Sequence, residues 1–217
     1  MGNFANVLLM ILPMILAITL HEAAHAFAAK RYGDRTAEMA GRLTLNPVSH
    51  IDPMGTIAVP AVMFLLSSGI GTPLIFGWAK PVPIQPRNFR NVRVGMRMTA
   101  LAGPLSNLVQ MIVWAIMIWF AHILPEQFHR PFTTMCIYGV SFNAVLFALN
   151  IIPIPPLDGS RVVDSFLNYK QSQTYRKIEP YGTWIILFLL ITGVLGLVLY
   201  PMVEFLIFAV GKLVGLF

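Results

Sequence analysis

The stretch FANVLLMILPMILAITLHEAAH, residues 4–25, decides the fold because an uncharged apolar run leads directly into a metal-binding motif. A run of this length predicts a membrane-crossing helix. His21 and His25 are four residues apart, so they share one helical face and can converge on a single Zn²⁺. Glu22 lies close enough to hold a water molecule and accept its proton. Ionisable residues are costly in a bilayer and mark functional sites, so we expect hydrolysis within or beside the membrane.

Composition supports a membrane protein with a single domain. The 217 residues are 57% hydrophobic and only 11% charged, whereas a typical soluble domain has about 25% charged residues. We expect one domain over 1–217, with a catalytic core over about 1–165 and C-terminal helices over about 183–217. The net charge of +6 does not indicate nucleic-acid binding, because the basic residues flank apolar runs. The only cysteine, Cys136, lies in an apolar stretch, which excludes disulfides and cysteine-ligated zinc.

Apolar runs predict an all-α polytopic membrane protein with four to six membrane segments. A helix needs about 20 residues to span a bilayer. The stretches long enough to do so are 4–29, 98–121, 133–153 and 183–203. Segment 54–77 is too short for two full crossings, which need about 40 residues. A single crossing there would scatter the basic segments over both sides. We therefore expect 54–77 to form a re-entrant hairpin.

Two short segments predict a small β element at the cytoplasmic face. Residues 41–47 (GRLTLNP) alternate apolar and polar side chains and end in a turn signal. Residues 80–86 (KPVPIQP) are extended because prolines forbid helix. Val82 and Ile84 would keep their amides on one edge, as in an edge strand that binds an extended substrate. A rigid connecting loop fits 80–86 equally well.

A catalytic zinc ion needs a third protein ligand and one open position. Three other histidines (His50, His122 and His129) and a few carboxylates are candidates. Asp158 is the best of them, because it follows three prolines just past an apolar helix. Irregular backbone at membrane depth is tolerated only inside protein or beside a wet cavity, which suits a metal-binding carboxylate.

Three motifs resemble the site-2 protease family, peptidase family M50, in its compact form without PDZ or CBS domains. They are HEAAH at 21–25, AGPLSN at 102–107 and NIIPIPPLDG at 150–159. The resemblance runs over most of residues 1–165. It implies one Zn²⁺ per chain and the following roles: ligands His21, His25 and Asp158, base Glu22, and a substrate or oxyanion contact at Asn150. Gly103 and Asn107 either support the site from behind its ligands or only permit tight helix packing.

Chelation of one ion by His25 and Asp158 would place both helix ends at one depth on the same side. Basic residues gather on that side in segments 30–53, 78–97 and 158–182, whereas the 122–132 loop has only Arg130. The positive-inside rule then predicts a multi-pass cell-membrane protein with a cytoplasmic zinc side. Its expected partners are the lipid bilayer and a transmembrane protein substrate. The oligomeric state is not predicted.

We therefore expect a zinc-dependent intramembrane endopeptidase that cleaves transmembrane segments. One alternative is a membrane metalloprotease of another class, with a glutamate as third ligand; Glu126, Glu179 and Glu204 are the downstream candidates. A second is a non-proteolytic metal-binding or transport protein. A transporter would show polar residues along several spans, whereas here they cluster at one depth.

Overall fold

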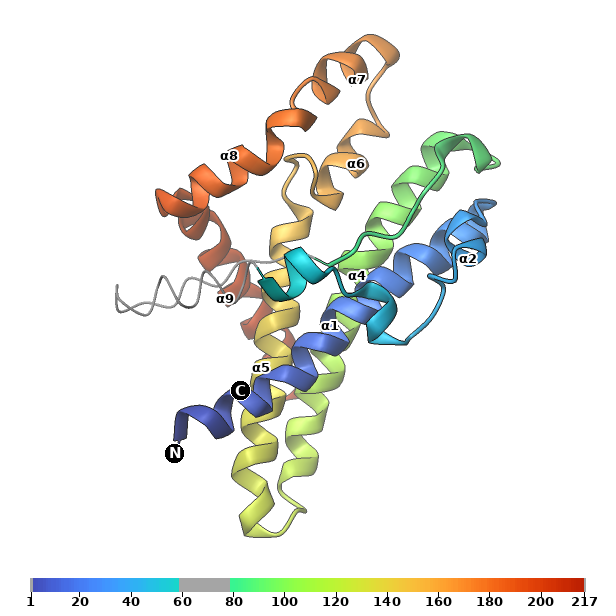
Figure 1. The fold of residues 1–217 in the computed structure, drawn as a ribbon. Coiled ribbons are helices and arrows are strands. Elements are labelled where there is room, and N and C mark those ends of the chain that lie inside the picture. Colours follow the sequence, from blue (N-terminus) through green and yellow to red (C-terminus); the bar gives the residue numbers. More distant parts are fainter. Residues whose placement is uncertain (1, 59–78, 217) are drawn as a thin grey trace.

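The computed structural model describes residues 2–58 and 79–216 and is built from helices (Figure 1). Four of the described helices are long and apolar enough to cross a membrane. They lie within α1 (Gly2–Tyr32), α4 (Val92–Ala121), α5 (Glu126–Ile151) and α9 (Val194–Val214). The all-α membrane class is thus confirmed.

Helices α1, α4 and α5 form the centre of the molecule. α4 and α5 run antiparallel and are joined by a short loop, and α1 crosses both of them obliquely (Figure 1). Gly139 on α5 allows a close approach to α4, because a Cβ there would lie 2.3 Å from the Trp114 ring. Small residues at such crossings let membrane helices pack closely, and a cluster around Met111, Trp114 and Val140 fills the space beyond.

The C-terminal part differs from the predicted span over 183–203. α8 (Glu179–Ile191) has only 13 residues, and Gly193 turns the chain in the left-handed conformation at φ 76°. The long apolar helix is therefore α9, which begins eleven residues later than predicted, at Val194. The prediction was wrong because hydropathy does not register a turn between two apolar helices. α9 ends beside the end of α4, where Trp119 Nε1 donates to Val214 O at 3.0 Å.

Short helices occupy the connections between the long ones. Their bounds are Thr36–Met39 (α2), Pro47–His50 (η1), Pro53–Ala58 (η2, a π-helix), Pro86–Asn88 (η3), Asp158–Asp164 (α6) and Tyr169–Arg176 (α7). Asn46, Asn91 and Asn168 each cap the helix that follows, by accepting a hydrogen bond from its first turn. The connections are therefore ordered by local polar contacts.

The prediction of a small β element is wrong for the described residues, which contain no strand. In 41–47, the chain leaves α2 at Gly41 with φ 66°, and Arg42 N donates back to Ala37 O at 2.8 Å. Asn46 then opens η1, so local turns satisfy the backbone. Segment 80–86 is extended but has no neighbouring strand. The re-entrant hairpin over 54–77 lies almost wholly outside the described residues; only η2 falls within it.

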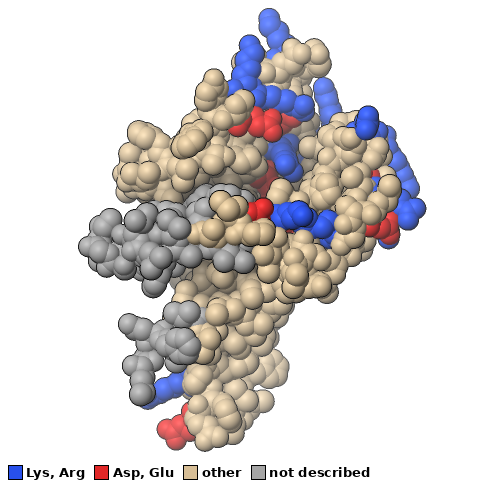
Figure 2. Space-filling model, viewed as in Figure 1, with Lys and Arg blue, Asp and Glu red and all other residues tan. Residues whose placement is uncertain are grey.

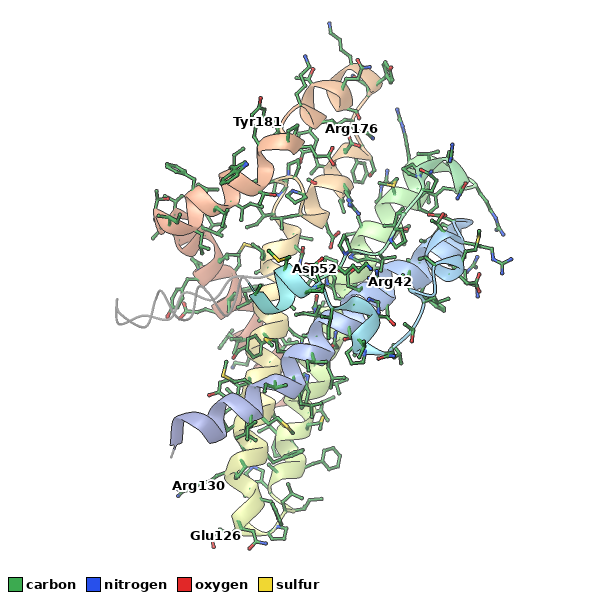
Figure 3. All side chains as sticks on the ribbon, viewed as in Figure 1. Arg42, Asp52, Glu126, Arg130, Arg176 and Tyr181 are labelled. Carbon is green, nitrogen blue, oxygen red and sulfur yellow. The ribbon has the colours of Figure 1, made fainter. Side chains whose placement is uncertain are left out.

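Charged side chains gather at one end of the molecule, over α2, α6, α7 and the start of α4 (Figure 2). The band below them shows almost none, and the charges at the opposite end belong to the start of α5 (Figures 2 and 3). An uncharged band between two polar ends is what a bilayer requires. The four apolar helices and this band identify a membrane protein.

Candidate metal centre and active site

His21 and His25 lie one turn apart on α1 and are both buried. Their Nε2 atoms are 3.0 Å apart, and their rings meet edge to face at 4.6 Å. α4 covers them, since α1 and α4 pack along this length. The helical spacing therefore brings both imidazoles to one point, as the motif predicted.

Each imidazole is oriented by a hydrogen bond at its other nitrogen. His21 Nδ1 lies 2.6 Å from Asn107 Oδ1, and His25 Nδ1 lies 2.7 Å from the Thr99 carbonyl oxygen. Both partners are acceptors, because the Asn107 amide nitrogen donates elsewhere, to Ala17 O at 3.2 Å and Asn143 Oδ1 at 2.9 Å. The protons must then sit on Nδ1, which leaves both Nε2 lone pairs free for a metal.

Asp158 reaches the imidazoles from the turn between α5 and α6. Its Oδ2 lies 3.2 Å from His21 Nε2 and 3.1 Å from His25 Nε2. Gly159 permits this turn, because a Cβ there would lie 2.2 Å from the Ile151 carbonyl oxygen at the end of α5. Both Nε2 atoms thus face the same carboxylate oxygen.

These three atoms fit a metal ion. Asp158 Oδ2 is buried and has no hydrogen-bond donor among the described residues. The two nitrogen atoms that face it present lone pairs, not protons. Lone pairs this close repel unless a cation sits between them. Ligand atoms bound tetrahedrally to zinc at about 2.0–2.1 Å lie roughly 3.3 Å apart, close to the 3.0–3.2 Å observed. The donor set matches a zinc site with one position left open.

Glu22 completes the group. One of its carboxylate oxygens lies within 4.8 Å of the imidazole ligand atoms. Its Oε2 accepts a hydrogen bond of 3.0 Å from the Val82 amide, sixty residues further along the chain. Glu22 can thus reach a molecule held beside the imidazoles while the extended segment fixes its position.

Gly103 of α4 lies directly behind the imidazoles. A Cβ at this position would be 2.4 Å from His25 Nε2 and 2.6 Å from His21 Cε1, closer than real side chains approach. Gly103 therefore provides the space in which the rings sit, and Asn107 one turn later orients one of them. The same face of α4 therefore both permits close helix packing, at Gly103, and orients an imidazole, through Asn107.

The remaining predicted site residues lie further from the imidazoles. Asn150 donates its amide to Leu146 O in its own helix at 3.0 Å, and no hydrogen bond among the described residues joins it to His21, His25 or Asp158. Ile84 has an amide without a partner among the described residues. His50 is buried and bonds through Nε2 to Thr44 O at 3.0 Å. His122 and His129 pair with each other beyond the end of α4.

A cavity of about 250 Å³ opens beside the turn that carries Asp158. Val82 and Ile84 line one side, and Pro155, Ser160 and Arg161 line the other. Its lining combines apolar residues with polar and charged ones, which include Arg161, Asp164, Arg176 and Glu179. A peptide in extended form would find both hydrogen-bonding groups and apolar contacts here.

Sequence reasoning missed three buried polar residues near this group. Asn143 on α5 anchors Asn107, while Asp34 and Arg42 contact the extended segment. Asp34 is fully buried and Arg42 is 8% exposed. Their partners lie far away in sequence, so no local spacing signals them. Burial of a charged residue type within a short loop is visible only in the fold.

Comparison with known proteins shows relatives over nearly the whole chain. The chain is 34% identical over 199 residues to "Putative zinc metalloprotease YwhC" of Bacillus subtilis, covering 90% of this chain and 85% of that protein. It belongs to this zinc metalloprotease family. It is also 30% identical over 189 residues to "Putative zinc metalloprotease Rip2" of Mycolicibacterium smegmatis, covering 87% of this chain and 69% of that protein. No family model and no solved structure matches the chain.

Membership in this family agrees with the geometry of the site. The names of the relatives imply zinc, and the group of His21, Glu22 and His25 can hold a metal ion. The four apolar helices make this chain a membrane member. The protein is thus a metalloprotease-family member in the membrane.

Proposed function

We propose that this protein is a zinc-dependent intramembrane endopeptidase of the site-2 protease type, which cleaves transmembrane segments of other proteins. The observation that carries the proposal is the convergence of two Nε2 lone pairs and the Asp158 carboxylate within 3.2 Å of one another. Two of these ligands belong to α1, an apolar helix able to cross a membrane. Chemistry at such a site acts on chains that enter the membrane.

The residues have distinct roles in this proposal. His21, His25 and Asp158 bind one zinc ion, and Asn107 and the Thr99 carbonyl keep the imidazoles in the tautomer that can ligate. Zinc bound here would polarise the substrate carbonyl and lower the pKa of a coordinated water to about 7. Glu22 accepts the proton from the attacking water and passes it to the leaving amine. Buried apolar surroundings strengthen each of these electrostatic contacts.

The substrate must present an unwound stretch, because an intact helix hides its carbonyl groups in internal hydrogen bonds. The cavity beside Asp158 supports this part of the proposal, since Ile84 lines it and its amide has no partner among the described residues. Asn150 would contact the substrate or its oxyanion after the substrate has bound. Basic residues at the metal end of the molecule (Figure 2) favour a cytoplasmic position for the site in the cell membrane.

The test uses the full chain in lipid nanodiscs with single-span test proteins that carry a helix-breaking Asn-Gly pair within the span. Wild-type protein should cut within the span and contain one zinc per chain. Glu22→Gln should retain zinc but lose cleavage by at least about 1,000-fold, since it removes the base. Cleavage retained in Glu22→Gln, or found only outside the apolar span, would overturn the proposal.

Asp158→Ala distinguishes this proposal from a glutamate-ligated metalloprotease. Glu126 lies in the first turn of α5, at the far end of the molecule from the imidazoles (Figure 3). Glu204 lies on α9 and bonds to Tyr200 there. Glu179 lies in the first turn of α8 and is exposed, whereas both imidazoles are buried. We therefore expect zinc to be lost from Asp158→Ala. Full zinc content in this variant would favour the other class.

A further inference from the structure

The extended segment 80–85 is held almost entirely by distant parts of the protein. Lys80 N donates to His50 O at 3.0 Å, Val82 N to Glu22 Oε2 at 3.0 Å, and Gln85 N to Asp34 Oδ2 at 2.6 Å. Its two prolines have no amide hydrogen. Each of these bonds goes to a different element, so the segment has one defined position.

Two buried charges hold the ends of this segment. Arg42 is 8% exposed and its Nη2 donates to Lys80 O at 2.6 Å. Asp34 is fully buried and, besides Gln85 N, accepts hydrogen bonds from Thr36 and Asn88. Neither forms an ion pair within the described residues.

A buried charge without a countercharge is costly unless hydrogen bonds offset the loss of water. Hydrogen bonds that involve a charged group are also stronger than neutral ones. Arg42 and Asp34 both direct their charge at the backbone of the same short segment. Val82, whose amide binds Glu22, lies between the two held ends.

We propose that Arg42 and Asp34 are positioning residues, which clamp segment 80–85 so that the Val82 amide fixes the Glu22 carboxylate beside the imidazoles. This inference rests on the proposed function, in which Glu22 is the base. It assigns the Val82 amide to the enzyme, and leaves Ile84 as the amide of this segment that is free for substrate. A general base must lie within hydrogen-bond reach of its proton, and a displacement of about 1 Å can reduce the rate about 100-fold.

Asp34→Asn tests the clamp with almost no change of shape. Both carboxylate oxygens accept hydrogen bonds, so the new amide group must face a donor in either orientation. Keeping the oxygen toward Thr36 and Asn88 sets the amide against Gln85 N and loosens the segment. We expect kcat to fall about 10- to 100-fold, with KM and zinc content unchanged. Arg42→Gln releases the other end and should have the same effect.

Thr36→Val is the matched control, because it removes a donor to the same carboxylate without touching the segment. It should lower stability but leave kcat within about two-fold. A fall in kcat equal to that of Asp34→Asn would mean that Asp34 acts only on stability, and would overturn the clamp. Unchanged kcat in Asp34→Asn and Arg42→Gln would also overturn it.

A double-mutant cycle with Glu22→Asp separates positioning from general loosening. The shorter side chain of aspartate cannot keep the bond to Val82, so Asp34→Asn should cost less than about three-fold in that background. An undiminished loss there would refute the clamp. If both buried-charge variants fail to fold, hydrogen exchange of Val82 decides: Glu22→Ala should exchange at least about ten-fold faster than wild type, and equal rates refute the clamp.

Failure of the proposed function looks different in these experiments. It would appear as absent cleavage by the wild-type protein, or as cleavage that persists in Glu22→Gln. An active wild type with an inactive Glu22→Gln and fully active Asp34→Asn would refute the clamp alone.

Discussion

Substitution of Gly103 by alanine adds one methyl group at the back of the metal site. The added Cβ would lie 2.4 Å from His25 Nε2, 2.5 Å from His25 Cε1 and 2.6 Å from His21 Cε1. Ordinary contact begins at 3.4 Å, so the His25 ring must move by about 1.0 Å. Both rings are already fixed at Nδ1 by Asn107 and the Thr99 carbonyl. The His25 ring can therefore move only by displacing its Nε2 atom from the position in which it faces the metal site.

A shift of this size exceeds what a metal site tolerates. Ligand distances in a good site vary by only about ±0.2 Å, roughly one-fifth of the required movement. We expect Gly103→Ala to lose most of its zinc after dialysis against a mild chelator, and at least about 100-fold of its cleavage rate. Elemental analysis and cleavage of a single-span test protein measure the two effects in the same preparation.

Gly196→Ala is the control, because this helical glycine of α9 has nothing within 4 Å of an added Cβ. The same substitution there should retain zinc and activity and stabilise the helix by about 1 kcal/mol. Wild-type zinc content and activity in Gly103→Ala would refute the reasoning, since the imidazole rings would then be able to move in spite of their hydrogen bonds at Nδ1.

Three further predictions follow from other contacts. Asn107→Ala removes the acceptor that orients His21 and should weaken zinc binding about 10- to 100-fold, as measured by competition with a chromophoric chelator; unchanged affinity would contradict the role of Asn107. Ile84→Pro removes the free amide beside the cavity and should raise KM at least about five-fold while kcat and zinc stay near wild type; Val82→Pro should lower kcat instead, and identical effects would show that the two amides share one role. Burial raises the pKa of the Asp34 carboxyl, but hydrogen bonds from Thr36, Gln85 N and Asn88 outweigh burial and lower it. The ionised form therefore stabilises the fold above the usual pKa of about 3.9. This contribution is lost as pH falls through the lowered pKa of the folded state. The difference in Tm between wild type and Asp34→Asn should therefore shrink as pH falls below about 4, and a difference that is constant with pH would contradict this.

The sequence predicted those features that depend on local spacing. The four-residue interval of His21 and His25 determines that they meet on one face of α1, and the apolar runs locate three of the four long helices. Asp158 was predicted beside them, and the structure brings the three together. Their roles as ligands, and that of Glu22 as base, remain predictions.

Features that depend on distant partners could not be predicted in this way. The alternation in 41–47 suggested a strand, but Arg42 is buried and bonds to Lys80 O, far along the chain. Val82 was a possible substrate contact from its sequence, and its amide binds Glu22, sixty residues away. The hydrogen-bond partners of Arg42 and Val82 depend on how α1 packs against the connecting segments. A periodic pattern carries no information about that packing.

The order along the chain of the three side chains that converge at the candidate site has a consequence for biogenesis. His21 and His25 leave the ribosome early, on the first helix, whereas Asp158 follows only after α4 and α5 have been synthesised. Gly182 at the start of α8 then docks against the Asp158 turn, where a Cβ would lie 1.7 Å from Pro155 O. The nascent chain therefore lacks one of the three converging side chains until both α4 and α5 have been synthesised.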